Sequence, residues 1–143
     1  MTTRSYDIRV DKHVDDISSL NVVLVADLHL GYSIGCSDME KMVDRINALN
    51  PDVVIYAGDI FDNDYDALDD PERLVEIMRN VSAAYGSYAV FGNHDVTETL
   101  VGGFSTASRT KAFRDPRMET FLEQAGINIM HDEVTTIADG KIN

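Results

Sequence analysis

The order of apolar and polar positions along the chain alternates short apolar runs with longer amphipathic stretches. The short runs, which have the composition of strands buried inside a sheet, are 22–26, 53–57 and 87–91. The longer stretches, which repeat apolar residues at helical spacing, are 37–49, 71–81 and 116–125. Strands connected by crossover helices predict a largely parallel sheet, so we expect an α/β fold.

The predicted helices have recognisable start and stop residues. Ser37 and Glu40 have the spacing of a capping box at the start of the first helix. Asp70-Pro71 and Asp115-Pro116 combine a capping aspartate with a proline suited to the first helical turn. Gly126 marks the end of the third helix.

The two ends of the chain are less regular. Tyr6–Val10 alternates apolar and polar residues and predicts a first short strand. Ile127–Met130 and Val134–Ala138 are strand-like, and Asp139-Gly140 predicts a tight hairpin turn. Because only residues 141–143 follow that turn, we expect residues 1–143 to be the N-terminal part of a single domain; a frayed natural tail is the alternative.

The charge balance restricts the classes of partner. The 25 acidic residues outnumber 12 basic ones and give a formal net charge of −13. Such a field repels polyanions, so we expect no nucleic-acid-binding surface. A site that gathers acidic side chains around divalent cations remains compatible. Cys36 is the only cysteine, which excludes an intramolecular disulfide and a cysteine-based zinc cluster.

Three polar clusters directly follow the three predicted strands. They are Asp27-Leu28-His29, Gly58–Asp62 and Gly92–Asp95. Ligands bind at the carboxyl ends of strands in open α/β sheets, so we expect these clusters to converge. Carboxylate, amide and imidazole donors together suit manganese, iron or zinc better than calcium. Two such ions about 3.5–4 Å apart can hold a phosphoryl group and generate hydroxide at neutral pH.

These clusters, written Asp-x-His, Gly-Asp-x-x-Asp and Gly-Asn-His-Asp, resemble the motifs of the calcineurin-like metallophosphoesterase family. Each motif alone is weak, but their order and spacing after strands are specific. The resemblance covers about Tyr6 to the end and implies a layered helix–sheet–sheet–helix fold. The context Asp-Leu-His-Leu-Gly-Tyr and the run 46–52 are similar to a bacterial branch whose members often carry an N-terminal membrane anchor.

The resemblance implies two divalent metal ions in the full enzyme. Asp27 and His29 would bind the first ion, Asp59 would bridge both, and Asn93 would bind the second. The family adds three histidines from later Gly-His and Gly-His-x-His motifs, and no Gly-His pair occurs in this sequence. We therefore expect at most one metal ion here, at Asp27, His29 and Asp59, and a chain that is impaired alone.

The resemblance also implies hydrolysis of phosphomonoesters or phosphodiesters by metal-bound hydroxide. His94 would protonate the leaving oxygen, and Asp62 would hydrogen-bond His94 and orient it. The substrate would be a phosphorylated small molecule or a lipid headgroup. A non-catalytic scaffold of the same fold is the alternative, and intact His94 and Asp62 favour the enzyme. Three basic residues would contact the substrate: Arg109, Lys111 and Arg114. The alternative is that they form only a solvated segment that leads into the third helix.

The acidic run 62–66 also matches the first positions of a calcium-binding EF-hand loop. Such a loop needs glycine at position 6 and a bidentate glutamate at position 12. Ala67 and Arg73 occupy those positions, so we expect a solvated loop rather than a calcium site.

The expected early end of the chain predicts self-association, and the resemblance to the bacterial branch predicts a location. An uncovered sheet face and open strand edges favour association, so we expect a homo-oligomer formed through that face or through the 127–142 hairpin. The similar bacterial branch implies that the parent protein lies at a membrane surface. The basic cluster Arg109–Arg117 would then face anionic headgroups.

Overall fold

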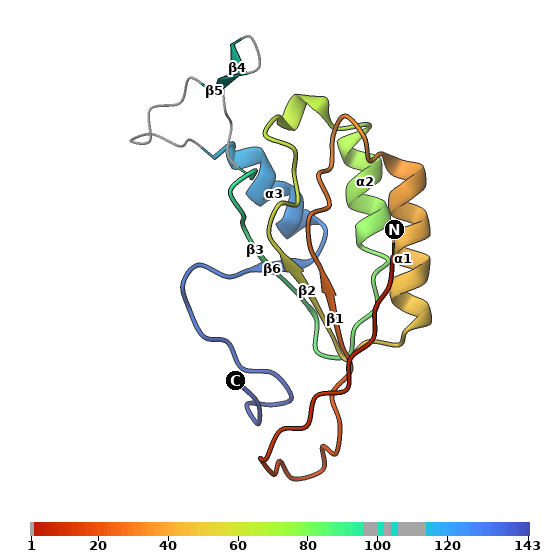
Figure 1. The fold of residues 1–143 in the computed structure, drawn as a ribbon, viewed down its shortest axis with the longest axis vertical. Helices are drawn as coiled ribbons and strands as arrows, with labels where there is room; N and C mark the ends of the chain where they lie inside the picture. Colours follow the sequence, from red (N-terminus) through yellow and green to blue (C-terminus); the bar gives the residue numbers. More distant parts are fainter. Residues whose placement is uncertain (1, 96–99, 102–103, 106–113) are drawn as a thin grey trace.

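The computed structural model describes residues 2–95, 100–101, 104–105 and 114–143 (Figure 1). The parallel sheet consists of β1 (Val22–Val25), β2 (Val53–Ala57), β3 (Ser87–Val90) and β6 (Ile127–Ile129), in that spatial order. The helices are α1 (Cys36–Ala48), α2 (Pro71–Met78) and α3 (Pro116–Gln124), with a short 3-10 helix, η1 (Tyr65–Ala67). A two-stranded antiparallel ribbon pairs β4 (Leu100–Val101) with β5 (Phe104–Ser105). The α/β fold with a parallel sheet is therefore confirmed.

The helices form one layer against one face of the sheet. α1 packs beside α2, α2 contacts α3, and α3 packs on β6. The parallel register aligns Val23 with Val54 and Tyr56 with Ala89, so alternate residues of neighbouring strands face the helices together. Most residues of the apolar stripes predicted from helical spacing lie in one core, whereas Leu49, at the end of the first stripe, is 41% exposed. The buried stripe residues are Met39, Met42, Val43, Ile46, Leu74, Val75, Met78, Met118, Phe121, Leu122 and Ala125.

The opposite face of the sheet is only partly covered. Val22 and Leu24 of β1 are 44% and 66% exposed, and Val90 of β3 is 42% exposed. The C-terminal segment contributes Met130, Ile137 and Ile142 to an apolar pocket that Val53, Ile55 and Tyr88 also line. The C-terminal loop segment therefore covers the middle of this sheet face, and part of β1 stays exposed.

Two of the three predicted helix starts are confirmed. Asp70 and Asp115 are the N-cap residues of α2 and α3, and each accepts a hydrogen bond from a backbone N–H of the first turn. The capping box at Ser37 is wrong, because α1 begins at Cys36 with Gly35 as its N-cap. A Cβ at position 35 would lie 2.8 Å from a carboxylate oxygen of Asp69. That carboxylate, from a segment distant in sequence, instead accepts the N–H of Cys36 at 3.4 Å.

The predicted strands at the chain ends differ from the structure. Tyr6–Val10 is not a strand. Its three apolar side chains are strongly exposed, and no strand of the described part of the chain pairs with it. Val134–Ala138 is also not a strand. The turn at Asp139-Gly140 is confirmed, closed by an antiparallel bridge between Ile137 and Ile142. Ile127–Ile129 does not open a hairpin, because it pairs in parallel with β3.

Candidate metal centre

The first two polar clusters run side by side beyond the ends of β1 and β2. The N–H of His29 donates to the carbonyl of Asp59 at 3.0 Å, and the N–H of Leu30 donates to Ile60 at 2.9 Å. The N–H of Asp62 returns to the carbonyl of Leu30 at 3.0 Å. These bonds continue the parallel pairing after the strands end, and they bring His29 and Asp59 together as predicted.

The backbone adopts left-handed conformations at the residues that carry the donors. Asp27, His29 and Asp59 have φ values of 54°, 49° and 51°. A residue with a Cβ pays roughly 1–2 kcal/mol for this conformation, and such costs are borne where surrounding contacts hold the chain. Similar φ values also occur in ordinary turns of this chain, including Asp139. At the strand ends, the inter-cluster hydrogen bonds supply the contacts that stabilise these conformations.

Asp27, His29 and Asp59 form the first donor group. Each offers one ligand atom, and these atoms all lie within 4.8 Å of one another. Metal–oxygen and metal–nitrogen bonds of about 2.0–2.2 Å place two opposed ligands no more than about 4.4 Å apart, so small side-chain movements would accommodate one ion. Asp27 is exposed and the other two are half-buried, which leaves the group accessible from solvent. These residues fit a divalent cation.

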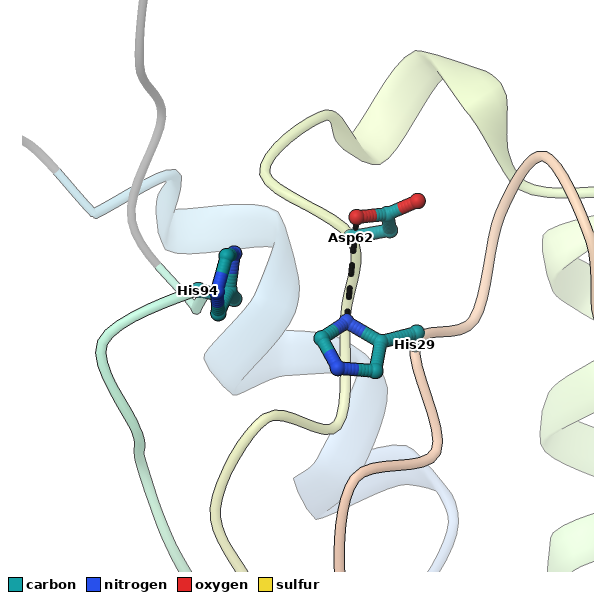
Figure 2. Close-up of side chains that lie close together, drawn as sticks. All are labelled: His29, Asp62 and His94. Atoms are coloured by element: carbon teal, nitrogen blue, oxygen red, sulfur yellow. Dashed lines mark ion pairs between the residues drawn. The ribbon is translucent and has the colours of Figure 1, made fainter. Parts of the chain in front are cut away.

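His29, Asp62 and His94 form a second group around the same histidine (Figure 2). Asp62 Oδ1 lies 3.7 Å from His29 Nδ1. The rings of His29 and His94 meet edge to face, with centroids 5.1 Å apart. The carboxylate of Asp62 and a ring nitrogen of His94 lie within 4.8 Å. Asp62 and His94 therefore lie in one site, as the sequence predicted. The hydrogen bond by which Asp62 would orient His94 stays a prediction.

The third cluster is held against the carboxylate of Asp59. The backbone N–H of His94 donates to Asp59 Oδ1 at 2.9 Å. A Cβ at position 92 would overlap that same oxygen, so Gly92 allows this close approach. Asn93, which lies between Gly92 and His94 in the sequence, is exposed. Asn93 directly follows Gly92, which lies against Asp59. The role of Asn93 as a metal ligand stays a prediction.

Asp95 is the site residue for which the sequence predicted no role. It is completely buried, with 0% exposure. Its Oδ1 accepts the N–H of Phe61 at 2.7 Å, and its Oδ2 accepts the N–H of Gly92 at 2.6 Å. The available sequence signal was its place as the last residue of Gly-Asn-His-Asp, directly after a buried strand.

The structure describes one of the three basic residues expected to contact substrate. Arg114 places its guanidinium 3.9 Å from the centre of the Phe91 ring and 3.4 Å from Glu119. Its Nε is buried and has no hydrogen-bond partner among the described residues. Arg114 therefore lies beside the strand end that leads into the third cluster. Arg109 and Lys111 lie outside the described residues.

The acidic run after Asp62 is organised by Arg117. Arg117 pairs with Asp115 and Asp66 at 2.6 Å each, and its guanidinium lies 4.6 Å from the centre of the Tyr65 ring. Hydrogen bonding from Arg117 lowers the pKa of both Asp66 and Asp115. Asp64 caps η1 by accepting the N–H of Asp66. Asp64, Asp66 and Asp115 therefore have hydrogen-bond or ion-pair partners within the protein.

Known proteins with similar sequences include one from a vertebrate and two from bacteria. A "Transmembrane protein with metallophosphoesterase domain" of Danio rerio is 33% identical over 133 residues, covering 85% of this chain and 30% of that protein. The "UDP-2,3-diacylglucosamine pyrophosphatase LpxG" of Chlamydia trachomatis is 30% identical over 96 residues, covering 64% and 29%. The "Uncharacterized metallophosphoesterase YkuE" of Bacillus subtilis is 30% identical over 86 residues, covering 60% and 28%.

The chain spans less than a third of the length of these relatives. Within its described residues, no helix has the length and apolar character needed to cross a membrane. The family model described as calcineurin-like phosphoesterase matches residues 20–140, which include the three clusters and the four strands of the parallel sheet. The chain belongs to the calcineurin-like phosphoesterase family.

Proposed function

We propose that this chain is the N-terminal part of a metallophosphoesterase domain, and that the whole domain hydrolyses phosphoric esters at a dinuclear metal centre. The observation that carries the proposal is the convergence of Asp27, His29 and Asp59 within 4.8 Å, beside the imidazole of His94. The donor group favours an enzyme over a scaffold of the same fold, because a scaffold has no need of a cation site next to a proton donor.

Divalent manganese, iron or zinc at this centre would supply a nucleophile at neutral pH and charge stabilisation for the phosphoryl group. Asp27 and His29 would hold one ion, Asp59 would bridge, and Asn93 would belong to the second position. Three donors converge on the first position, whereas Asp59 and Asn93 are the two assigned to the second. We therefore expect this chain alone to bind one ion at most, and a second ion to require histidines from the remainder of the domain.

His94 would act as the general acid. Its ring nitrogen transfers a proton to the leaving oxygen as the phosphorus–oxygen bond breaks. Its backbone N–H is fixed to Asp59 at 2.9 Å, which holds the residue next to the assigned metal positions. Asp62 would stabilise the protonated ring of His94 and orient it, since a carboxylate favours the charged imidazole.

The proposed substrate is a phosphomonoester or phosphodiester of a small molecule or a lipid headgroup. The printed name of the chlamydial relative, a UDP-2,3-diacylglucosamine pyrophosphatase, supports a lipid-linked substrate. Arg114, which lies beside the strand end, would contact the substrate phosphate together with Arg109 and Lys111. We also propose that the parent protein associates with a membrane, which the name of the Danio rerio relative supports.

The partly uncovered sheet face supports a proposal about assembly. Leu24 and Val90 expose apolar surface there, and the C-terminal segment that covers the rest lacks regular strands. We propose that this chain self-associates through that face or through residues 127–142. Light scattering at low micromolar concentration should give a mass above that of one chain. A monomer that unfolds cooperatively would contradict the proposal.

A metal-dependence assay tests the enzymatic proposal. The whole protein should hydrolyse p-nitrophenyl phosphate or bis-p-nitrophenyl phosphate after loading with manganese, lose activity with a chelator and recover it on reloading. Asp27→Asn should lose activity while keeping the cooperative unfolding of the wild type. Activity that survives both chelation and Asp27→Asn would contradict the proposed function.

A further inference from the structure

The three clusters are joined by two junctions of different construction. The junction between the first and second clusters consists of backbone bonds. The N–H groups of Asp27, His29 and Leu30 donate to Gly58, Asp59 and Ile60, and Asp62 donates back to Leu30. A junction of this kind is insensitive to side-chain identity, because the groups that form it belong to the backbone of every residue except proline.

The junction between the second and third clusters depends on side chains. In the part of the chain that the structure describes, its backbone contribution is one bond, from the N–H of Asn63 to the carbonyl of His94 at 3.0 Å. The remaining bonds use the carboxylates of Asp59, which accepts the N–H of His94, and Asp95, which accepts the N–H of Phe61. The position of His94 relative to Asp59 therefore depends on two acidic side chains.

Asp95 is the acidic residue of this junction that is not assigned as a metal ligand and belongs to neither donor group. Its two oxygens each accept one backbone N–H, from Phe61 in the second cluster and from Gly92 in its own. Phe61 lies between Asp59 and Asp62, and Gly92 begins the turn that carries Asn93 and His94. A single buried carboxylate thus links the loop of the bridging aspartate to the loop of the general acid, without water access to replace either bond.

We infer that Asp95 is a positioning residue that sets the placement of His94 and Asn93 against Asp59. This inference rests on the proposed function for the role of His94, while the link itself is independent of it. An amide at position 95 can accept only one of the two N–H groups and turns an N–H₂ donor toward the other. Asp95→Asn should therefore loosen the third cluster and leave the Asp27–His29–Asp59 group intact.

The direct test is amide hydrogen exchange followed by NMR on this chain. Wild type should show scalar couplings across the hydrogen bonds from the Phe61 and Gly92 amides to the Asp95 carboxylate carbon. In Asp95→Asn, exchange should accelerate by about tenfold or more at His94 and at Phe61 or Gly92. Exchange at Leu30 and Asp62, which belong to the backbone junction, should change by less than about threefold.

Asp52→Asn is the matched control. The Asp52 carboxylate also links two strands by accepting a backbone N–H, from Asn21 at 2.7 Å, but at the amino end of β1 and β2. Its replacement should accelerate exchange near Asn21 and leave His94 unchanged. Asp95→Glu, which keeps both acceptor oxygens, should retain more protection at His94 than Asp95→Asn does.

Two further measurements separate the inference from the proposed function. Asp95→Asn should keep manganese affinity within about threefold of the wild type, and in the whole protein it should slow turnover more for an alkoxide-like leaving group than for p-nitrophenolate. If the scalar couplings to Asp95 are missing in wild type, or if Asp95→Asn accelerates amide exchange equally at Leu30 and His94, the positioning role is wrong. If exchange behaves as expected while turnover is insensitive to His94→Ala, only the proposed function fails. If Asp95→Asn does not fold, the wild-type couplings and Asp95→Glu still decide the question.

Discussion

Two groups of donors share His29 at the edge of the sheet, and they differ in their numbers of carboxylates and imidazoles. The Asp27 group combines one imidazole with the carboxylates of Asp27 and Asp59. The Asp62 group has one carboxylate and two imidazoles, because His94 replaces the second acid. Two carboxylates balance the charge of a divalent cation, whereas a cation bound to His94 would displace the proton that a general acid needs. From this difference we propose that the first group binds the metal ion and that the second serves proton transfer.

The largest expected effect is the loss of turnover in His94→Ala, which tests whether the Asp62 group serves proton transfer. His94→Ala should lower turnover of the whole protein by about 10²–10⁴-fold with an alkoxide-like leaving group, because general acid catalysis contributes that much. The loss should be smaller with p-nitrophenolate, which needs little protonation. Steady-state kinetics with both substrates measures this. Equal losses for both would show that His94 serves the metal or the fold instead.

Asp62→Asn should lower turnover less than His94→Ala and tests the same group of donors. Asp62 touches His29 and lies near His94, so its removal should disturb the orientation of both rings. Losing such an outer partner costs about 10–100-fold in activity. The pattern across the two leaving groups should follow that of His94→Ala in weaker form. A loss confined to manganese affinity would instead assign Asp62 to the metal group.

The smallest effect is expected at Arg117, which ties η1 to the start of α3. Its ion pairs lower the pKa of Asp66 and Asp115 in the folded chain. A depressed carboxyl pKa stabilises the fold above the unfolded value of about 3.9, and this contribution is lost as pH falls through the folded pKa. Arg117→Leu should therefore melt slightly below wild type at pH 7, and this difference should shrink below about pH 4. Thermal melts across that range measure it, and a difference independent of pH would contradict the ion-pair explanation.

The sequence predicted those parts of the fold that depend on local pattern. Val53–Ala57 is an apolar run that became a strand with the predicted bounds, and Asp70 caps the helix that it was expected to cap. The location of the site followed from polar residues placed directly after such runs, because parallel strands end at one edge. Asp27, His29 and Asp59 therefore came together as expected.

The errors arose where distant residues decide the local structure. The start of α1 is determined by Asp69, which is 33 residues away from Cys36, and no pattern around Ser37 contains that information. Tyr6–Val10 has the alternation of a strand but no strand pairs with it in the described part of the chain. The role of Asp95 also depends on a distant partner, the N–H of Phe61, which is 34 residues away.

The central claim is that Asp27, His29 and Asp59 form the metal position of this chain. Manganese titration followed by electron paramagnetic resonance, with wild type, Asp27→Asn and Asp62→Asn compared at neutral pH, tests it most directly. We predict no more than one equivalent bound by wild type, an affinity loss of about 100-fold or more for Asp27→Asn, and a loss of about tenfold for Asp62→Asn. Two equivalents bound per chain, or an Asp27→Asn variant that binds like wild type, would contradict the account.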